Sequence, residues 1–412
     1  MIGVGLELKA EVMALVDSGE PWRTTRGHAG GGLGLDATQE RIPELHPTRF
    51  DLEDTVGIKA HLQAEGFAVV GDVAGQAELE HARDLLWAHL EGQDCPRMQQ
   101  ARPKGWRRGE PATWRAFRGK GFDAPTSVEP FYGVSHSDAG LMTSTTHSDC
   151  LWYARSLPGV RDAFAAALGN IDFVCSYDRM VITLPTSSGN PIALRAGAAP
   201  TYDHGSRLDL RHLHVHHNRN PYSQELCYGI LNLFDADKST GSTAVVPRSH
   251  VVETFERSSP SDLSEFRKRG LMPCVCVCQA GDLLLIDSGT LHCTCYAEDP
   301  TGASGNGPNE LLRAACITCM HPVRLLSPTI LRARQRAYEL DIFTGGSCLT
   351  EAAAEHLLAA VESWGSDRNV RNLADAPPDR QQLVDPSYSD PGWWRKSATQ
   401  GGPDSNVGAA RL

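Results

Sequence analysis

Histidines gather in one short stretch of the chain, in the sequence HLHVHH that begins at His212. If this stretch is a β-strand, His212, His214 and His216 share one face and His217 lies on the other. Neutral imidazole offers a nitrogen lone pair near pH 7 and suits several divalent metals. His292 ends the hydrophobic run GDLLLIDSGTLH, which reads as a distant strand, and is placed to complete a site. The pattern predicts a histidine-ligated metal.

Two polar residues share a strand face with Ile230. Tyr228 and Asn232 each lie two positions away from it, so all three side chains point the same way in a strand. Their phenol and amide groups could bind a substrate or an acidic cofactor, or they could only tie neighbouring strands together. We also expect His212 and Thr294 to line the pocket.

Seven of the twelve cysteines crowd into residues 274–319, which otherwise read as strands. A secreted disulfide scaffold is short and rich in loops, unlike this chain. Cys274, Cys276 and Cys278 alternate with valines, and the C-x-x-C pair ending at Cys319 has no second pair at zinc-site spacing. We expect reduced thiols that fill the core.

The strands that would position these residues recur at short intervals between Gly, Pro, Asp and Ser clusters. The strand-like runs are 67–70, 173–185, 212–218, 226–234, 243–247, 274–278, 283–287 and 311–320. One helix is expected from residue 56 up to the first of these strands, and a second one contains Leu79, Ala82, Leu86 and Leu90 on one face. Further helices are expected over 151–169, where Gly169 ends the helix, and over 328–363. Helices do not alternate with the later strands, which argues against parallel winding and for a mainly β fold with helical additions, of the α+β class.

We expect three regions along the chain. Residues 1–55 form a partly irregular N-terminal arm, residues 56–345 form one domain, and residues 346–412 form a C-terminal helix and a loose tail rich in Pro, Asp, Gly and Ser.

Composition restricts the partners. Of 412 residues, 41% are hydrophobic and 22% are charged, which is ordinary for a globular protein, and the net charge of -11 disfavours nucleic acid and anionic membranes. The one basic stretch, residues 96–120, could grip an anionic ligand or could be a solvated loop. No signal peptide or membrane-spanning run is visible, which predicts a cytoplasmic protein with a small-molecule substrate. The sequence does not indicate the oligomeric state.

Several motifs in a fixed order resemble the phytanoyl-CoA dioxygenase family of Fe(II)- and 2-oxoglutarate-dependent oxygenases. The family has a His-x-Asp pair, an apolar strand ending in Asp, a VVP-x-SH turn and a later GD-LL-x-D-S-x-x-x-H run. This chain has HVHHNRNP, LNLFDAD, GSTAVVPRSH and GDLLLIDSGTLH in that order. Each motif is weak alone, and the order carries the resemblance, which spans residues 56–335.

The resemblance implies a double-stranded β-helix core, which is a jelly roll of the cupin type. It also implies Fe(II) held by two histidines and a carboxylate, with open positions for 2-oxoglutarate and O₂. His214 would be the first ligand, His292 the distal ligand and Arg313 the cation that pairs with the 2-oxoglutarate carboxylate, with Arg324 as the fallback. Tyr228 and Asn232 would then contact the same cofactor.

One position departs from the family: His216 stands where the family has its Asp ligand. A three-histidine site could keep Fe(II), could prefer another divalent metal such as Cu, Ni or Zn, or could have lost iron. Asp203 or Asp209 could supply a carboxylate from outside the motif, and His217 could serve only if a bulge turned it inward.

The function that follows is a non-haem metal-dependent oxygenase that oxidises a small organic substrate with Fe(II) and 2-oxoglutarate, through a His214, His216 and His292 site. Two alternatives stay open. One is a catalytically silent relative that binds a metal or metabolite, and the other is a three-histidine oxygenase independent of 2-oxoglutarate, in which Arg313 would bind the substrate's own carboxylate.

Overall fold

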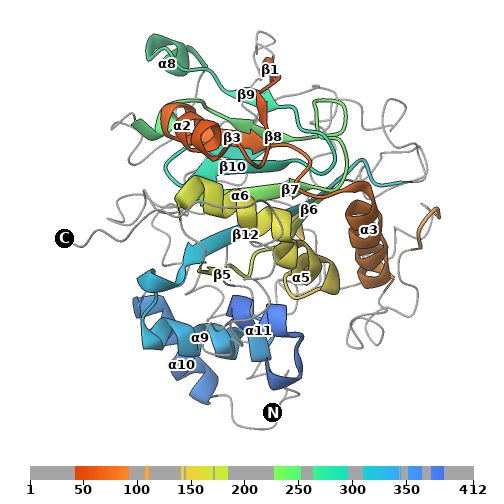
Figure 1. Ribbon diagram of the computed structural model, residues 1–412, viewed down its shortest axis with the longest axis vertical. Helices are drawn as coiled ribbons and strands as arrows, with labels where there is room; N and C mark the ends of the chain where they lie inside the picture. The colour runs from red at the N-terminus through yellow and green to blue at the C-terminus, as the bar shows by residue number, and fades with distance from the viewer. Residues whose placement is uncertain are drawn as a thin grey trace, which may run out of the picture.

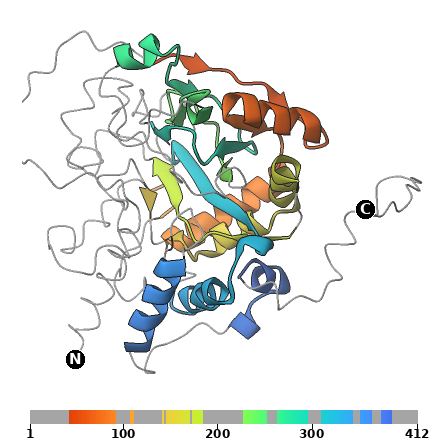
Figure 2. The same cartoon turned by 90° about the vertical axis from the view of Figure 1, so that its left-hand side faces the viewer.

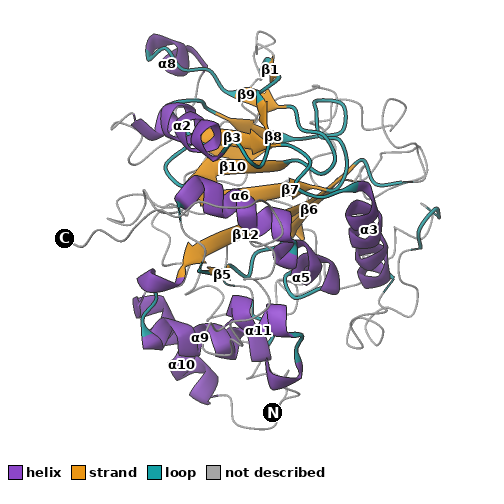
Figure 3. Cartoon of the chain, viewed as in Figure 1, coloured by secondary structure: helices purple, strands orange, loops and turns teal. Residues whose placement is uncertain are grey.

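The computed structural model combines two β-sheets with eight α-helices in the part of the chain that it describes (Figures 1 and 3). The described residues are 42–91, 107–110, 141–142, 145–169, 172–183, 227–251, 263–295, 310–342, 344, 351–363 and 373–384. The architecture confirms the α+β class. It is not mainly β, because helices contain more of these residues than the short strands do.

The larger sheet has eight strands and forms the centre of the molecule. Its order is β2–β3–β10–β7–β12–β6–β4, and β5 pairs with the far end of β12. The bounds are β2 (Arg49–Phe50), β3 (Phe67–Val70), β4 (Leu141–Met142), β5 (Phe173–Cys175), β6 (Met180–Thr183), β7 (Cys227–Asn232), β10 (Leu283–Asp287) and β12 (Arg313–Pro322). Only the β2–β3 pair is parallel among its described pairs. The expected strands at 67–70, 226–234, 283–287 and 311–320 are confirmed.

The smaller sheet has four strands in the order β1–β9–β8–β11. They are β1 (Glu44–Leu45), β9 (Cys274–Cys276), β8 (Thr243–Val245) and β11 (His292–Thr294). Val245 and Cys276 from this sheet pack in one buried cluster with Ile230, Leu284 and Ile317 from the larger sheet. The two sheets therefore face each other, and a side chain on either inner face points into the same interior.

Helices α2 (Thr55–Glu65), α3 (Gln76–Leu90), α5 (Asp149–Ser156) and α6 (Pro158–Leu168) cover the outer face of the larger sheet. In Figure 2, α2 in red-orange and α6 in yellow lie to one side of the sheet. Gly229 allows a close approach, because a Cβ there would stand 2.7 Å from the ring of Phe164 on α6. The helix expected over 151–169 is two helices, since Pro158 begins α6 and cannot continue α5.

The C-terminal helices α9 (Pro328–Glu339), α10 (Glu351–Ser363) and α11 (Pro378–Val384) pack beyond β5 (Figure 1). Arg334 on α9 is buried and donates to the carbonyls of Cys175 and Leu383. Part of the expected tail, residues 373–384, is therefore built into the core, and β1 and β2 likewise tie part of the expected N-terminal arm to the sheets.

The remaining short elements are α8 (Leu263–Lys268) and the 3₁₀ turns Ser249–Val251, Val323–Leu325 and Leu373–Asp375. The ten described cysteines form no disulfide, and all but Cys274 are buried, which confirms the expected role as core filling. Among the described helices, none is long and apolar enough to cross a membrane.

Candidate functional site

Residues predicted for the site come from both sheets and face the interior between them. His292 pairs with Val245 and Thr294 pairs with Thr243, so both point inward from the smaller sheet. From the larger sheet, Tyr228 belongs to the interior cluster itself. Asn232 shares the face of Tyr228 on β7, and Arg313 shares the face of Ala315 and Ile317 on β12, both members of that cluster.

His292 begins a strand rather than ending one. The hydrophobic run predicted as a single strand stops at Asp287, turns, and enters the other sheet as β11 at His292. The ring is buried, and its Nδ1 lies 2.8 Å from the carbonyl oxygen of Thr290. A carbonyl only accepts, so Nδ1 carries the proton, and in the neutral ring Nε2 carries the lone pair. That tautomer suits a metal ligand.

The turn before His292 is fixed to the end of α2. Thr290 donates its hydroxyl to the carbonyl of Gly66 over 2.8 Å, and Gly66 caps the helix with a φ of +81°. His250 lies against the same corner, with Nε2 3.0 Å from the carbonyl of Gln63. The PRSH segment thus forms a turn, and Ser249 in it accepts from the backbone N–H of Leu291, which supports the backbone that presents His292.

Arg313 is a fully buried cation. Its Nη2 donates to the hydroxyl of Thr243 on the smaller sheet over 3.0 Å, while Nε and Nη1 have no hydrogen-bond partner among the described residues. Burial lowers the pKa of the guanidinium to about 10. A buried charge costs free energy unless an opposite charge accompanies it. The planar guanidinium of Arg313 has two nitrogens available as donors, which is the arrangement that binds a carboxylate in bidentate fashion.

Arg324, the alternative to Arg313, is exposed in the turn after the opposite end of β12. It lies beyond the ten-residue strand that begins with Arg313, so the two cations occupy opposite ends of the sheet. Of these two arginines, only Arg313 is buried in the interior between the sheets.

Tyr228 is anchored by a carboxylate that sequence reasoning gave no role. Its hydroxyl donates to Oδ2 of Asp178 over 2.5 Å, and its ring centroid lies 5.7 Å from that of His292. Burial raises the pKa of the Asp178 carboxyl and of the Tyr228 hydroxyl. Asp178 lies in a run that reads as one continuous strand, so the sequence carried no signal for its inward direction.

The two other predicted pocket residues differ in their contacts. Asn232 is buried, and its Nδ2 makes only long bonds of 3.4 Å to the carbonyls of Ile230 and Asp282, while Oδ1 has no hydrogen-bond partner within the described chain. Thr294 is half-buried beside Thr243. Both positions border the interior that contains Arg313.

The first metal ligands predicted from sequence, His214 and His216, lie outside the described residues, as do His212, His217, Asp203 and Asp209. Within the described residues, no group of three or more His, Cys, Asp or Glu side chains could hold a metal. Of the basic stretch 96–120 the structure describes only 107–110, where Arg108 pairs with Asp84 and Glu310. The three-histidine set therefore stays a prediction.

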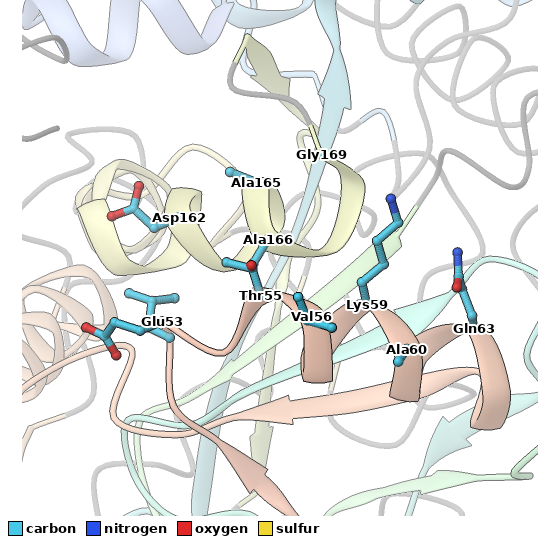
Figure 4. Close-up of a pocket in the computed structure, with 11 residues that line it drawn as sticks. Glu53, Thr55, Val56, Lys59, Ala60, Gln63, Asp162, Ala165, Ala166 and Gly169 are labelled. Atoms are coloured by element: carbon cyan, nitrogen blue, oxygen red, sulfur yellow. The ribbon is translucent and has the colours of Figure 1, made fainter. Parts of the chain in front are cut away.

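An open groove of about 770 Å³ lies elsewhere, on the outer surface between α2 and α6 (Figure 4). Its polar lining, Glu53, Thr55, Lys59, Gln63 and Asp162, includes both signs of charge, and Val56, which also lines it, is 79% exposed. None of the predicted site residues lines this groove, so it is separate from the interior between the sheets.

Comparisons with known proteins give distant matches. No family model matches the chain. A curated relative, Ava biosynthesis cluster protein O from Aspergillus versicolor, is 23% identical over 233 residues, which cover 51% of this chain and 62% of that protein. The matched region thus spans less than two thirds of that relative.

Several of the similar solved structures are described as non-haem enzymes. The alpha-ketoglutarate-dependent epimerase SnoN from nogalamycin biosynthesis has 12% identity and a TM-score of 0.36, covering 66% of this chain and 83% of its own, and it has also been solved with Fe³⁺ and alpha-ketoglutarate. AviO1 from Streptomyces viridochromogenes has 14% identity and a TM-score of 0.38, and the match covers 66% of this chain and 96% of AviO1. The non-haem monooxygenase ThoJ has 14% identity and a TM-score of 0.38, and the match covers 80% of this chain and 98% of ThoJ.

Proposed function

We propose that the chain is a non-haem metal-dependent oxygenase that uses 2-oxoglutarate to oxidise a small organic substrate. The observation that carries the proposal is Arg313, a buried guanidinium with two donors that no described residue accepts, on the same interior as His292. A dicarboxylate such as 2-oxoglutarate would supply the missing negative charge. The ordered sequence motifs support the same assignment.

The proposed core is a double-stranded β-helix. Two facing sheets of mostly antiparallel strands support it, with β10 and β11 crossing from one sheet to the other through a short turn. In such a core, ligands bind between the sheets, which is where the predicted residues of the described chain point.

His214, His216 and His292 would hold the metal, with Fe(II) as the expected ion and Cu, Ni or Zn as alternatives. When bound, Fe(II) and 2-oxoglutarate would reduce O₂ and so supply an oxidant for C–H bonds. The described residues provide the rest: Thr290 sets the tautomer of His292, Arg313 pairs with a carboxylate of the cofactor, and the buried strands exclude water. Asn232 and Tyr228 would border the same cofactor.

The substrate is proposed to be a small organic molecule of a biosynthetic pathway. The name of the curated relative, a biosynthesis cluster protein, supports this class, and the acidic net charge disfavours nucleic acid. A cytoplasmic location is the corresponding expectation.

The test is an anaerobic Fe(II) titration of the protein and its His216→Asp variant, with and without 2-oxoglutarate. Metal-bound 2-oxoglutarate gives a weak visible charge-transfer band, so the band reports both ligands together. We expect the band in the native protein, and succinate formation once O₂ and a substrate are added.

Each other result selects an alternative. A band only in His216→Asp means that the native chain has lost the family's iron chemistry and is a silent binding protein. Metal binding and O₂ consumption without a band or succinate mean a 2-oxoglutarate-independent oxygenase, in which Arg313 binds the substrate's carboxylate. Absence of metal binding in both proteins would overturn the proposal.

A further inference from the structure

Asp178 places a carboxylate between the two sheets. Four residues, Ser176 to Arg179, stand opposite three residues of β12, Ile317 to Cys319, so the chain bulges between β5 and β6. A bulge redirects side chains next to it. Here Tyr177 packs on the outer side with the helices, and the Asp178 carboxylate reaches Tyr228 on the inner side.

The bulge is braced from outside the sheet. Arg155 on α5 is fully buried and donates to the carbonyl oxygens of Asp178 and Thr146 over 2.9 and 2.8 Å. Its guanidinium also stacks 4.9 Å from the ring centre of Trp152. Because Arg155 bonds the backbone of Asp178, it fixes the position of that residue without pairing directly with its carboxylate.

The carboxylate itself accepts two short hydrogen bonds. They come from the Tyr228 hydroxyl over 2.5 Å and from the backbone N–H of Arg179 over 2.7 Å. The only ion pair that the described residues form with it is to Nε of Arg179, at 3.8 Å. Buried carboxylates are usually paired closely or lie near a metal, so this one is suited to a further positive charge in the interior.

Tyr228 connects the carboxylate to His292. The two rings contact with centroids 5.7 Å apart and planes tilted by 42°, and the tyrosine is held at its hydroxyl by Asp178. The histidine is held at Nδ1 by the carbonyl of Thr290. Two separate elements therefore contact His292, the turn at Thr290 and strand β7.

We propose that Asp178 is a positioning residue of the metal site, which orients His292 through Tyr228 and contributes a buried negative charge to the interior where His292 lies. The inference rests on the proposed function. It also accounts for His216, because three neutral imidazoles bring no negative charge to a divalent ion, whereas the family's carboxylate brings one. Asp178 would supply that charge from outside the ligand set.

The experiment measures divalent metal affinity, with Co(II) as a spectroscopic probe and Fe(II) under anaerobic conditions, in the full-length protein. Asp178→Asn removes the charge and keeps an oxygen that can accept from Tyr228. Tyr228→Phe keeps the charge of Asp178 and removes the hydrogen bond that links the Asp178 carboxylate to the ring at position 228. Asp162→Asn, which removes a carboxylate from the exposed face of α6, controls for net charge. Thermal unfolding of each apo variant shows that it is folded.

We expect Asp178→Asn to weaken metal binding by about 10- to 100-fold, the range seen for groups that support a ligand from outside the first shell. The Fe(III)/Fe(II) potential should rise, because a lost negative charge disfavours the more positive ion. Tyr228→Phe should also weaken binding, the double variant should be less than additive, and Asp162→Asn should match the native protein.

Native affinity and potential in folded Asp178→Asn would overturn the inference while leaving the proposed function standing. If Asp178→Asn does not fold, Tyr228→Phe decides: native metal affinity in that variant overturns the inference. A native protein that binds no divalent metal fails the proposed function, and the inference fails with it.

Discussion

The guanidinium of Arg313 donates to the hydroxyl of Thr243 over 3.0 Å, and this hydrogen bond crosses from the larger sheet to the smaller one. It is the only hydrogen bond that the guanidinium makes to the described residues. The interior between the sheets thus contains a cation that is positioned by one hydroxyl and still has donors for an acidic ligand.

Replacing Arg313 should abolish tight 2-oxoglutarate binding. Arg313→Met removes two charge-assisted hydrogen bonds, together about 3 kcal/mol or more, so affinity should fall roughly 100-fold or more. Arg313→Lys should recover only part of it, because an ammonium lacks the planar fork. Anaerobic titration with Fe(II) present measures the change. Arg324→Met, at the exposed end of β12, is the matched control and should bind normally; equal losses in both variants would contradict the assignment.

The same substitution should stabilise the protein without ligand. A buried cation that lacks a counterion costs desolvation free energy, and an apolar side chain of similar length avoids that cost. Arg313→Met should therefore raise the free energy of unfolding by roughly 1–3 kcal/mol in urea denaturation. A less stable variant would mean that the guanidinium already has a counterion in the protein without ligand.

Gly66 should tolerate no side chain. Its φ of +81° is left-handed, and a Cβ there would overlap Thr290 Oγ1 and approach His250 Nδ1. Gly66→Ala should lower the free energy of unfolding by roughly 2–4 kcal/mol, combining backbone strain with displacement of the turn before His292. Gly270→Ala is the control, since Gly270 has a φ of +68° but open space around it, and should cost only about 1–2 kcal/mol. Equal losses would mean that the contacts at Gly66 relax freely.

The hydrogen-bonded ion pair between Arg49 and Asp282 should contribute strongly to the free energy of unfolding. Asp282 is fully buried and accepts from Nε and Nη2 of Arg49, the latter at 2.7 Å. Arg49→Met leaves the buried carboxylate without its ion pair and should cost about 3 kcal/mol in urea denaturation. Arg336→Met breaks an exposed pair with Glu339 and should cost less than about 1 kcal/mol. Similar costs for both would contradict the role of burial.

Asp287 should make the protein less stable as pH rises through the mildly acidic range. Burial raises its pKa in the folded protein above the ordinary value of 3.8, so the folded state holds this proton more tightly than the unfolded chain does. Above 3.8 the unfolded chain gives up the proton first, and the folded state loses relative stability until it ionises as well. Asp287→Asn keeps an acceptor for the Gly289 N–H and removes the effect. Urea unfolding midpoints, measured from acid to neutral pH, should show that Asp287→Asn becomes more stable relative to the native protein as pH rises. If the two proteins show the same dependence of stability on pH, the raised pKa of Asp287 is contradicted.

The sequence by itself determined the local elements. Periodicity identified α3, β3, β7, β10 and β12, and strand parity placed Tyr228 and Asn232 on one face. Such patterns are local, because burial of one face repeats every two residues in a strand and every three to four in a helix. The order of motifs also singled out His292 and Arg313 without any knowledge of their distance in space.

Tertiary structure decided what meets in the interior. Parity could not tell that the run before His292 breaks and changes sheets, that Arg313 reaches Thr243, or that Asp178 leaves the strand pattern to anchor Tyr228. Each depends on a bulge, a turn or a partner far away in sequence, and these follow from how two sheets pack, which no single segment encodes. Residues 373–384 show the same limit, because their composition is mixed and their place in the core comes from contacts with β5, α5 and α9.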